Sequence, residues 1–312
     1  MKKMKYVIVG AGGVGGSIAA MLSLAGEEVT CIARNSHLHA LQGRGLYYRS
    51  HLKGNHLLPI PTFSSEEYKG HADVIFVCVK GYSISLIIDF LKRISHENTL
   101  VIPILNVYGT GPKIASLLPK NIRVIDGCIY IVGFKSAPGE ITQMGKIFRI
   151  VYGARSADDF VTKRMQEVAD VLLNAGIKVT ISDDINRDTF VKWSFISAMA
   201  VTGLYYDCTM ERLQDPDDAA YKTFYQLSSE TEALGKALGI HVVGGLLQHN
   251  LHIMSKLDPS STASMQKDMA AGTQTEIQGQ LFDIIDLAHQ QGVEMPHYME
   301  VAKKFKNYKT IK

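Results

Sequence analysis

Cysteine is scarce in this 312-residue sequence, and its four copies stand far apart. They are Cys31, Cys78, Cys128 and Cys208, and no two of them form a CxxC pair. In a chain of this length such isolated cysteines are typical of reduced thiols, whereas a metal site needs ligands paired at short spacing. We therefore expect neither a disulfide framework nor a metal site.

Long apolar runs are also missing. The uncharged and mostly apolar run from Trp193 to Tyr206 is shorter than the roughly 18 to 20 residues needed to cross a bilayer. The basic start of the chain leads into an apolar run that soon ends at glycines, which is unlike a secretory signal. The sequence thus predicts a soluble, cytoplasmic protein with no membrane partner.

Charge of one sign is not in excess either. The chain has 33 Lys and Arg against 30 Asp and Glu, so its formal net charge is +3, and the two signs are spread along the sequence. No basic block indicates a nucleic-acid partner, and no acidic tail indicates disorder. The 46% of hydrophobic residues is typical of a globular protein, and the length favours two domains.

The first part of the chain alternates strand-like runs with helical segments. A helical stretch over residues 14–25, closed by Gly26, connects the first two of these runs. The runs are rich in β-branched residues, as expected for strands buried on both faces, and cover residues 6–9, 29–33, 74–79 and 100–104. This alternation predicts a parallel sheet with crossover helices.

The pattern changes after residue 122. An antiparallel pair is predicted over 124–134 and 140–151, joined by the turn-forming Ser136-Ala137-Pro138-Gly139, and then a helix over 157–174 and a short strand over 177–180. Beyond about Asp183 we expect only helices, over 184–204, 217–238, 242–255 and 273–291. We therefore predict an α/β domain at residues 1–183 and an all-helical domain at 184–312.

A glycine-rich loop follows the first predicted strand and opens the first helix, the context required of a dinucleotide-binding loop. In its G-x-G-x-x-G pattern, Gly10 allows the tight turn, Gly12 lets the backbone approach a pyrophosphate, and Gly15 lets the helix pack closely on the strand. The alternative is a glycine-rich turn without a ligand. The pattern favours a doubly wound, Rossmann-type domain whose binding loop comprises Gly10, Ala11, Gly12, Gly13, Val14 and Gly15.

The end of the second predicted strand indicates which dinucleotide binds. NAD-binding proteins usually carry an acidic residue there, which hydrogen-bonds the ribose hydroxyls. Here that strand is followed by Arg34, whose guanidinium can bind a 2′-phosphate in a bidentate manner, while Glu27 and Glu28 lie at the other end. We therefore predict NADP(H) as the cofactor, with a solvated surface arginine as the alternative.

Lys192 is the first candidate for acid–base chemistry. On a helix its neighbours include Thr189, Phe195 and Ile196, so its ammonium would lie among mostly apolar groups. Burial disfavours the charged form of a lysine and lowers its pKa, which favours proton donation near neutral pH. The alternative is a lysine that extends to the surface and pairs with Asp188.

Three further polar residues stand where a site would need them. Lys80 and Asn106 follow the third and fourth predicted strands, and ligands of open α/β sheets bind outside the carboxyl ends of the strands. Glu276 flanks the apolar stripe of the predicted helix 273–291. Each has an ordinary alternative: a loop position for Lys80 and Asn106, and for Glu276 a first-turn glutamate favoured by the helix dipole.

Taken together, these residues resemble the ketopantoate reductase family (2-dehydropantoate 2-reductases), and the resemblance spans nearly the whole chain. It rests on an ordered set of motifs, of which the segment from Ser264 to Glu276 is the most specific. The matching positions are Gly10-x-Gly12-x-x-Gly15, Arg34, Val79-Lys80, Asn106 with Gly109-Thr110, Pro138-Gly139, Lys192, Ser264-Met265-Gln266-Lys267-Asp268, Thr275-Glu276-Ile277 and the stretch from His289 to Pro296.

The resemblance implies an NADP-dependent oxidoreductase that acts on a CH–OH group and reduces ketopantoate to pantoate in pantothenate biosynthesis. It implies that Lys192 is the general acid and that Glu276 binds substrate and is essential to turnover. The implied substrate contacts are Lys192, Asn106, Ser264 and Glu276, and the implied cofactor contacts outside the glycine loop are Arg34, Lys80 and Asn106.

The sequence departs from this family at the substrate pocket. Many members carry asparagines four and eight residues after the catalytic lysine, where this chain has Ile196 and Ala200. Because buried polar groups are a main source of discrimination, another small 2-keto acid stays open as the substrate. A non-catalytic NADPH sensor is a further alternative. The helical domain would bind the keto acid and is compatible with a homodimer.

Overall fold

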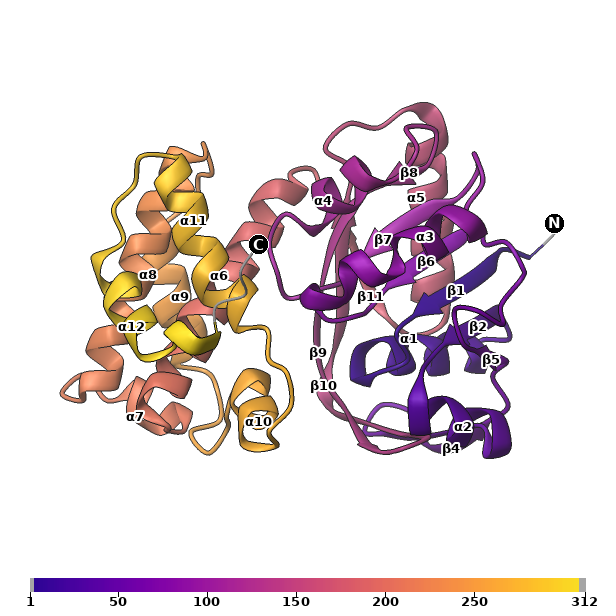
Figure 1. Ribbon diagram of the computed structural model, residues 1–312, viewed down its shortest axis with the longest axis horizontal. Helices are drawn as coiled ribbons and strands as arrows, with labels where there is room; N and C mark the ends of the chain where they lie inside the picture. The colour runs from indigo at the N-terminus through magenta and orange to yellow at the C-terminus, as the bar shows by residue number, and fades with distance from the viewer. Residues whose placement is uncertain (1–2, 309–312) are drawn as a thin grey trace. The chain divides into compact units, whose positions relative to one another are not determined.

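A computed structural model describes residues 3–308 and divides the chain into two compact units (Figure 1). The first unit comprises residues 3–105 and 109–185, and the second comprises 106–108 and 186–308. The sequence did not predict that the segment 106–108 groups with the helical unit. The segment does so because the Tyr108 ring packs against the rings of Phe190 and Trp193.

A parallel sheet forms the centre of the first unit. Its strand order is β5-β2-β1-β6-β7-β8, the order of a doubly wound dinucleotide-binding sheet, and the winding reverses between β1 and β6. The predicted Rossmann-type fold is confirmed. The strands are Lys5–Val9 (β1), Glu28–Ile32 (β2), Thr62–Phe63 (β5), Val74–Val77 (β6), Leu100–Pro103 (β7) and Arg123–Val124 (β8).

Both faces of this sheet are covered, which explains the uninterrupted apolar run in β1. Tyr6 and Ile8 belong to one apolar core and Val7 and Val9 to another, because successive side chains of a strand point to opposite faces. The helices of this unit are α1 (Gly13–Leu24), α2 (Asn35–Arg44), α3 (Ile84–Ile94), α4 (Thr110–Leu117) and α5 (Asp159–Asn174), with a 3₁₀ turn at Gly81–Ser83.

A second sheet packs on α1, and the sequence predicted only part of it. The antiparallel pair β9 (Asp126–Ala137) and β10 (Glu140–Gly153) is confirmed, with Pro138 and Gly139 in the turn between them. β10 also pairs in parallel with β3 and with β11, and β3 pairs with β4. The short strand predicted over 177–180 is confirmed as β11 (Lys178–Ile181), and the strands that the sequence did not predict are β3 (Leu46–Ser50) and β4 (Gly54–Leu58).

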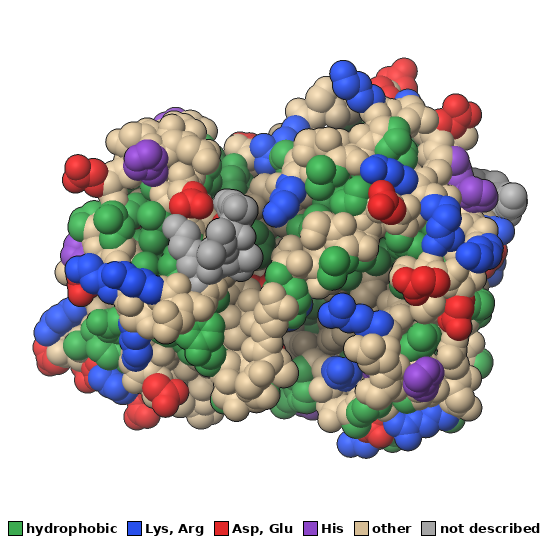
Figure 2. All heavy atoms as spheres, viewed as in Figure 1, with side chains coloured by type: hydrophobic (Ala, Val, Ile, Leu, Met, Phe, Trp, Pro, Cys, Tyr) green, Lys and Arg blue, Asp and Glu red, His purple; other side chains and the backbone are tan. Residues whose placement is uncertain are grey.

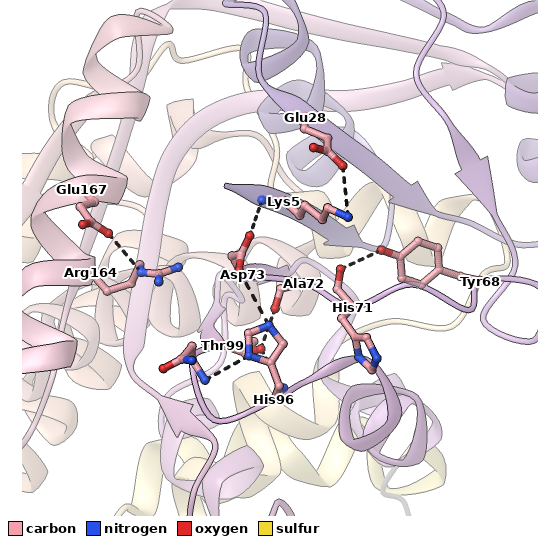
Figure 3. A network of polar contacts seen from close by, with 11 residues as sticks. Lys5, Glu28, Tyr68, His71, Ala72, Asp73, His96, Thr99, Arg164 and Glu167 are labelled. Carbon is pink, nitrogen blue, oxygen red and sulfur yellow. Dashed lines mark hydrogen bonds and ion pairs between the residues drawn. The ribbon is translucent and has the colours of Figure 1, made fainter. Parts of the chain in front are cut away.

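Polar side chains fasten the amino ends of the central strands (Figure 3). The Asp73 carboxylate, just before β6, accepts a hydrogen bond from the backbone N–H of Lys5 at 2.8 Å. The Thr99 hydroxyl, just before β7, donates to the carbonyl of Ala72 at 2.6 Å. These bonds lie at the amino edge of the sheet, opposite the glycine loop. Ligands of this fold bind at the other edge, formed by the carboxyl ends of the strands.

Every regular element in the described residues of the second unit is helical, as predicted. Its elements are α6 (Ile185–Tyr206, whose first residue belongs to the first unit), α7 (Met210–Gln214), α8 (Ala219–Ala237), α9 (Leu246–Met254), α10 (Ser264–Ala270), a π-helical segment (Gln278–Phe282), α11 (Asp283–Gln290), α12 (Pro296–Lys304) and a 3₁₀ turn (Lys306–Tyr308). Its core is centred on side chains such as Phe224, Leu281 and Tyr298.

Two predicted helices begin later than expected. The helix placed at 242–255 starts at Leu246, because Gly244 and Gly245 adopt positive φ angles that a helix does not use. In the helix placed at 273–291, Thr273 donates its N–H and hydroxyl back to the carbonyl of Asp268, and helical structure begins only after Glu276. Such local side-chain bonding competes with helix formation.

Within residues 3–308 no helix is long and apolar enough to cross a membrane. The cysteines are free thiols, and burial raises the pKa of Cys31 to about 12.

On the face shown in Figure 2, basic and acidic side chains are interspersed on the first unit. This arrangement agrees with the even spread of charge along the sequence.

Candidate active site

The glycine loop has the geometry that the sequence predicted for it. Gly10 has a φ of +101°, and a Cβ there would lie 3.0 Å from the carbonyl carbon and oxygen of Cys78, so both its conformation and its surroundings require glycine. Its N–H donates to the carbonyl of Ile32 at 3.0 Å, which holds the turn against β2. The loop therefore leaves β1 at the carboxyl edge of the sheet.

Gly12 and Gly15 serve opposite purposes. A Cβ on Gly15 would lie 2.1 Å from the carbonyl oxygen of Gly10, so this glycine lets α1 pack directly on the loop and on β1. A Cβ on Gly12 would meet no atom within 4 Å, so the backbone there borders open space. The loop is thus tight on its protein side and accessible at Gly12, as a pyrophosphate-binding loop must be.

The N-terminus of α1 suits an anion. Gly12 is its N-cap, no side chain caps it among the described residues, and its first turn contains no acidic residue. Helix N-terminal N–H groups and the positive end of the helix dipole favour a phosphate at such a position. The residues present therefore fit a dinucleotide, with the pyrophosphate at Gly12.

A further constraint on the loop was not foreseen. A Cβ on Gly13 would lie 2.2 Å from the carbonyl oxygen of Gly133 in β9, and one on Gly16 would lie 2.7 Å from the Ile141 side chain of β10. These glycines allow α1 to pack against the second sheet. The extra glycines around the G-x-G-x-x-G pattern were the only sign of this packing in the sequence.

Arg34 and Lys80 lie at the carboxyl ends of two strands. Arg34 is exposed, follows β2 and is the N-cap of α2. Lys80 is partly buried, follows β6 and is the N-cap of the 3₁₀ turn Gly81–Ser83. Both positions flank β1, from which the glycine loop departs, because β2 and β6 are its two neighbours.

Lys192 and Asn106 meet in the second unit. The Nζ of Lys192 donates a hydrogen bond to Oδ1 of Asn106 at 2.6 Å, and the Lys192 side chain is only 8% exposed. An ammonium next to an amide oxygen is oriented by that bond. The sequence predicted both residues at the site but not their contact, which joins positions 86 residues apart.

A rigid frame surrounds this pair. Gln280 donates from its Nε2 to the main-chain carbonyl of Asn106 at 2.9 Å, and Gln280 is 3% exposed. The Trp193 indole N–H donates to the carbonyl of Gly279 at 3.1 Å. Gly279 and Gln280 belong to the π-helical segment, and such segments occur often at functional sites. Nothing in the sequence pattern had indicated Gln280 or Trp193.

Glu276 and Ser264 belong to the same unit but differ in exposure. Glu276 is 7% exposed and lies just before the helical residues that begin at Ile277, with its carbonyl accepting the N–H of Gln280. Its position at the start of the helical residues is the one that the helix-dipole alternative also expects, so burial alone does not decide between the two roles. Ser264 is exposed and is the first residue of α10.

The positions that depart from the family lie on the same helix as Lys192. Ile196 is partly buried and Ala200 is buried, and both fall on one face of α6 with Lys192 because they follow it at intervals of four. Asp188, the partner considered for a surface lysine, bonds to the Nε of Arg187 at 3.1 Å. Within the described residues no group of three or more His, Cys, Asp or Glu could hold a metal.

Comparison with known proteins identifies the family. The model described as ketopantoate reductase PanE/ApbA matches residues 6–157, and the model of the C-terminal part of the same family matches residues 184–309. The chain belongs to the ketopantoate reductase family. It is therefore an NADP-dependent oxidoreductase that acts on a CH–OH group and binds a nicotinamide cofactor.

Relatives of this ketopantoate reductase family member cover most of its length. An uncharacterized oxidoreductase of Bacillus subtilis, YkpB, is 29% identical over 277 residues and covers 88% of both chains. The 2-dehydropantoate 2-reductase of Mesorhizobium japonicum is 26% identical over 259 residues, covering 76% of this chain and 77% of its own. That of Nostoc is 25% identical over 300 residues, covering 95% and 92%.

Solved structures show the same fold. A ketopantoate reductase family protein from Ralstonia eutropha aligns with a TM-score of 0.87 at 21% identity, over 98% of each chain. A D-mandelate dehydrogenase with NADH and anilino(oxo)acetate aligns with a TM-score of 0.88, also at 21% identity and over 98% of each chain. At this level of identity the likeness establishes the fold and not the substrate.

Proposed function

We propose that the protein reduces 2-dehydropantoate (ketopantoate) to pantoate with NADPH. The observation that carries the proposal is the buried hydrogen bond from Lys192 to Asn106, because it holds an oriented ammonium in a unit of a chain whose other unit has a dinucleotide-binding loop. Several curated relatives are 2-dehydropantoate 2-reductases. The proposal includes a role in pantothenate biosynthesis and a cytoplasmic location.

In the proposed reaction NADPH supplies a hydride to the carbonyl carbon of the keto acid. Lys192 donates a proton from Nζ to the carbonyl oxygen, so that the ketone becomes an alcohol and the lysine is left neutral until solvent protonates it again. Asn106 Oδ1 accepts one N–H of the ammonium and thereby fixes the direction of the other two donors. General acids of this kind typically contribute about 10²- to 10⁴-fold to the rate.

Other residues have roles in binding. Glu276 and Ser264 contact the substrate in the proposed complex, as their match to the family motif implies. The glycine loop binds the pyrophosphate through N–H groups at the start of α1, Lys80 and Asn106 lie near the cofactor, and Arg34 binds the 2′-phosphate. Correct orientation of the reacting groups matters because small misplacements are costly in rate.

A second substrate is favoured by one specific observation. Ile196 and Ala200 place apolar side chains at two positions of α6 that share a face with Lys192. An apolar pocket favours a keto acid with an apolar side chain over one that carries a hydroxyl, because a buried hydroxyl without a partner loses free energy. Another small 2-keto acid is therefore the alternative substrate.

The test is a comparison of kcat/KM for NADPH oxidation at 340 nm. The panel contains ketopantoate, 2-keto acids with aliphatic and aromatic side chains of similar size, and each substrate with NADH in place of NADPH. The highest kcat/KM for ketopantoate with NADPH supports the proposal. A higher value for an apolar 2-keto acid supports the alternative. Binding of NADPH without turnover of any substrate contradicts both.

Dimerisation is a further part of the proposal. The helical unit is the part to which we assign it, and one structural neighbour is a dimeric ketopantoate reductase from Staphylococcus aureus. Light scattering coupled to size exclusion measures the mass directly. We expect twice the chain mass of 34.4 kDa, and a mass of one chain at micromolar concentration would contradict a stable dimer.

A further inference from the structure

A buried histidine connects the glycine loop to two other elements. His37, on α2, is 7% exposed, and its Nε2 lies 2.7 Å from the carbonyl oxygen of Ala11 in the glycine loop. Its Nδ1 accepts a hydrogen bond from the backbone N–H of Gly139, in the turn between β9 and β10, at 2.9 Å. One imidazole thus joins two backbone partners that lie 26 and 102 residues from it in the chain.

These two partners determine the protonation state of the ring. A backbone carbonyl can only accept a hydrogen bond and a backbone N–H can only donate one, so His37 must carry its proton on Nε2 and none on Nδ1. The ring is therefore neutral. Burial, reinforced by the charge of Lys135 on β9, lowers the pKa of His37 and agrees with this assignment, although its bond to Ala11 acts in the opposite direction.

The bond to Ala11 also determines where a neighbouring N–H points. The carbonyl of Ala11 and the N–H of Gly12 belong to one planar trans peptide unit, in which the two groups point in opposite directions. Fixing the carbonyl toward His37 therefore directs the Gly12 N–H away from α2. A Cβ on Gly12 would contact nothing within 4 Å, so there is open space beside this residue that a ligand can occupy.

The loop needs such a constraint. A peptide unit that precedes a glycine rotates at low cost, because glycine tolerates conformations on both sides of φ. The same glycine that gives a ligand access thus makes the direction of its own N–H poorly defined. The neutral ring of His37 supplies a fixed donor for the Ala11 carbonyl and removes this freedom.

We propose that His37 is a positioning residue for the cofactor, which holds the Ala11–Gly12 peptide so that the Gly12 N–H points toward the pyrophosphate. The inference rests on the proposed binding of NADPH by this loop. His37 is three residues after Arg34 on the same helix, so α2 would position the pyrophosphate through His37 and bind the 2′-phosphate through Arg34.

The test compares two ligands that differ in the pyrophosphate. Isothermal titration calorimetry measures the Kd of NADPH and of adenosine 2′-phosphate, which carries the 2′-phosphate and no pyrophosphate. In His37→Phe the ring remains and both hydrogen bonds are lost. We expect the Kd of NADPH to rise by about 10- to 100-fold, the loss of a hydrogen bond to a charged group, and that of adenosine 2′-phosphate to change less than threefold.

Two further variants serve as controls. His37→Gln keeps one donor and one acceptor and should restore most of the NADPH affinity. His39→Gln removes an exposed histidine from the same helix and should leave both Kd values unchanged. Equal weakening of both ligands in His37→Phe would show that the substitution disturbs α2 as a whole and would overturn the inference, as would unchanged NADPH affinity.

A measurement on the unaltered protein keeps the inference testable if His37→Phe does not fold. In ¹⁵N-labelled protein the imidazole nitrogen shifts of His37 should show a neutral ring protonated at Nε2. A proton on Nδ1, or a charged ring at pH 7.5, would overturn the inference. The proposed function fails separately, because it is contradicted when the unaltered protein binds no NADPH or binds it without turning over any keto acid, whatever the His37 variants show.

Discussion

Lys192 makes the most direct prediction for a single residue. Replacing it by Ala removes the proposed proton donor but leaves the glycine loop intact. We expect kcat to fall by about 10²- to 10⁴-fold while the Kd of NADPH stays within twofold. Steady-state kinetics and calorimetric titration measure the two quantities. Lys256→Ala, which removes an exposed lysine from the same unit, is the matched control.

Unchanged kcat in Lys192→Ala would remove the lysine from the mechanism. A joint loss of kcat and NADPH affinity would instead assign Lys192 to cofactor binding. The distinction matters because Asn106, the hydrogen-bond partner of Lys192, was predicted to contact both ligands.

We propose that Arg34 determines the preference for NADPH over NADH. It is exposed at the start of α2 and follows β2, where NAD-binding proteins usually carry an acidic residue. We expect Arg34→Ala to raise the Kd of NADPH by about tenfold or more and to leave that of NADH unchanged, because only NADPH carries the 2′-phosphate. An equal loss for both cofactors, measured by calorimetry, would contradict this role.

At the scale of elements, two glycines of one loop provide a matched pair. Gly15→Ala places a Cβ 2.1 Å from the carbonyl oxygen of Gly10, so α1 must move away from the loop and β1. We expect a loss of stability of about 1–3 kcal/mol or more, measured by urea unfolding. Gly12→Ala meets no atom within 4 Å, so it should fold normally and weaken only NADPH binding. A loss of stability in Gly12→Ala, together with weaker NADPH binding alone in Gly15→Ala, would show that the loop does not bind the pyrophosphate.

The contact between α2, the glycine loop and the β9–β10 turn predicts a dependence on pH. Because the pKa of His37 is lowered in the folded protein, the unfolded chain takes up a proton first as the pH falls below about 6.5. The free energy of unfolding therefore decreases as the pH falls below that value, and it levels off once the pH is below the pKa of His37 in the folded protein. The charged groups nearby are Lys135 on β9 and, at the turn, Glu140, which Arg44 and Arg49 hold in ion pairs.

Urea unfolding at pH 7.5 and 5.5 tests this dependence. Comparison with His37→Gln cancels the contribution of other groups, such as His249, whose pKa is also lowered by burial. We expect the unaltered protein to lose more stability than the variant, by at most about 1.4 kcal/mol per pH unit. Identical losses would show that His37 is not held neutral by its two backbone partners.

The elements also show how far sequence alone reaches. The roles of Gly10, Gly12 and Gly15 were predictable because a strand, a loop and a helix that adjoin in sequence determine them. In the second sheet the β9–β10 pair and the strand β11 were predictable, but β3 was not, because it pairs with a distant segment: Tyr47 of β3 lies opposite Glu140 of β10. β3 and its neighbour β4 are short and partly polar, so their alternation is weak evidence for a strand.

At the scale of the whole molecule, the same limit applies to the site. Lys192, Asn106 and Glu276 could be named from their match to family motifs. The hydrogen bond between Lys192 and Asn106 could not be predicted from the sequence. It depends on the segment 106–108 belonging to the second unit, where Tyr108 stacks on Trp193. Gln280 and His37 were missed because their roles are hydrogen bonds to backbone groups, which leave no pattern in the sequence.

The proposed transfer of a hydride from NADPH to the carbonyl carbon of a 2-keto acid can be followed directly with an isotope. NADPH carrying deuterium in both positions at C4 of the nicotinamide tests it, with mass spectrometry of the product. We expect pantoate with one deuterium at C2 when ketopantoate is the substrate, and none in Lys192→Ala on the same time scale. Unlabelled product, or unchanged ketopantoate and 2-keto acids in the presence of bound NADPH, would contradict this hydride transfer.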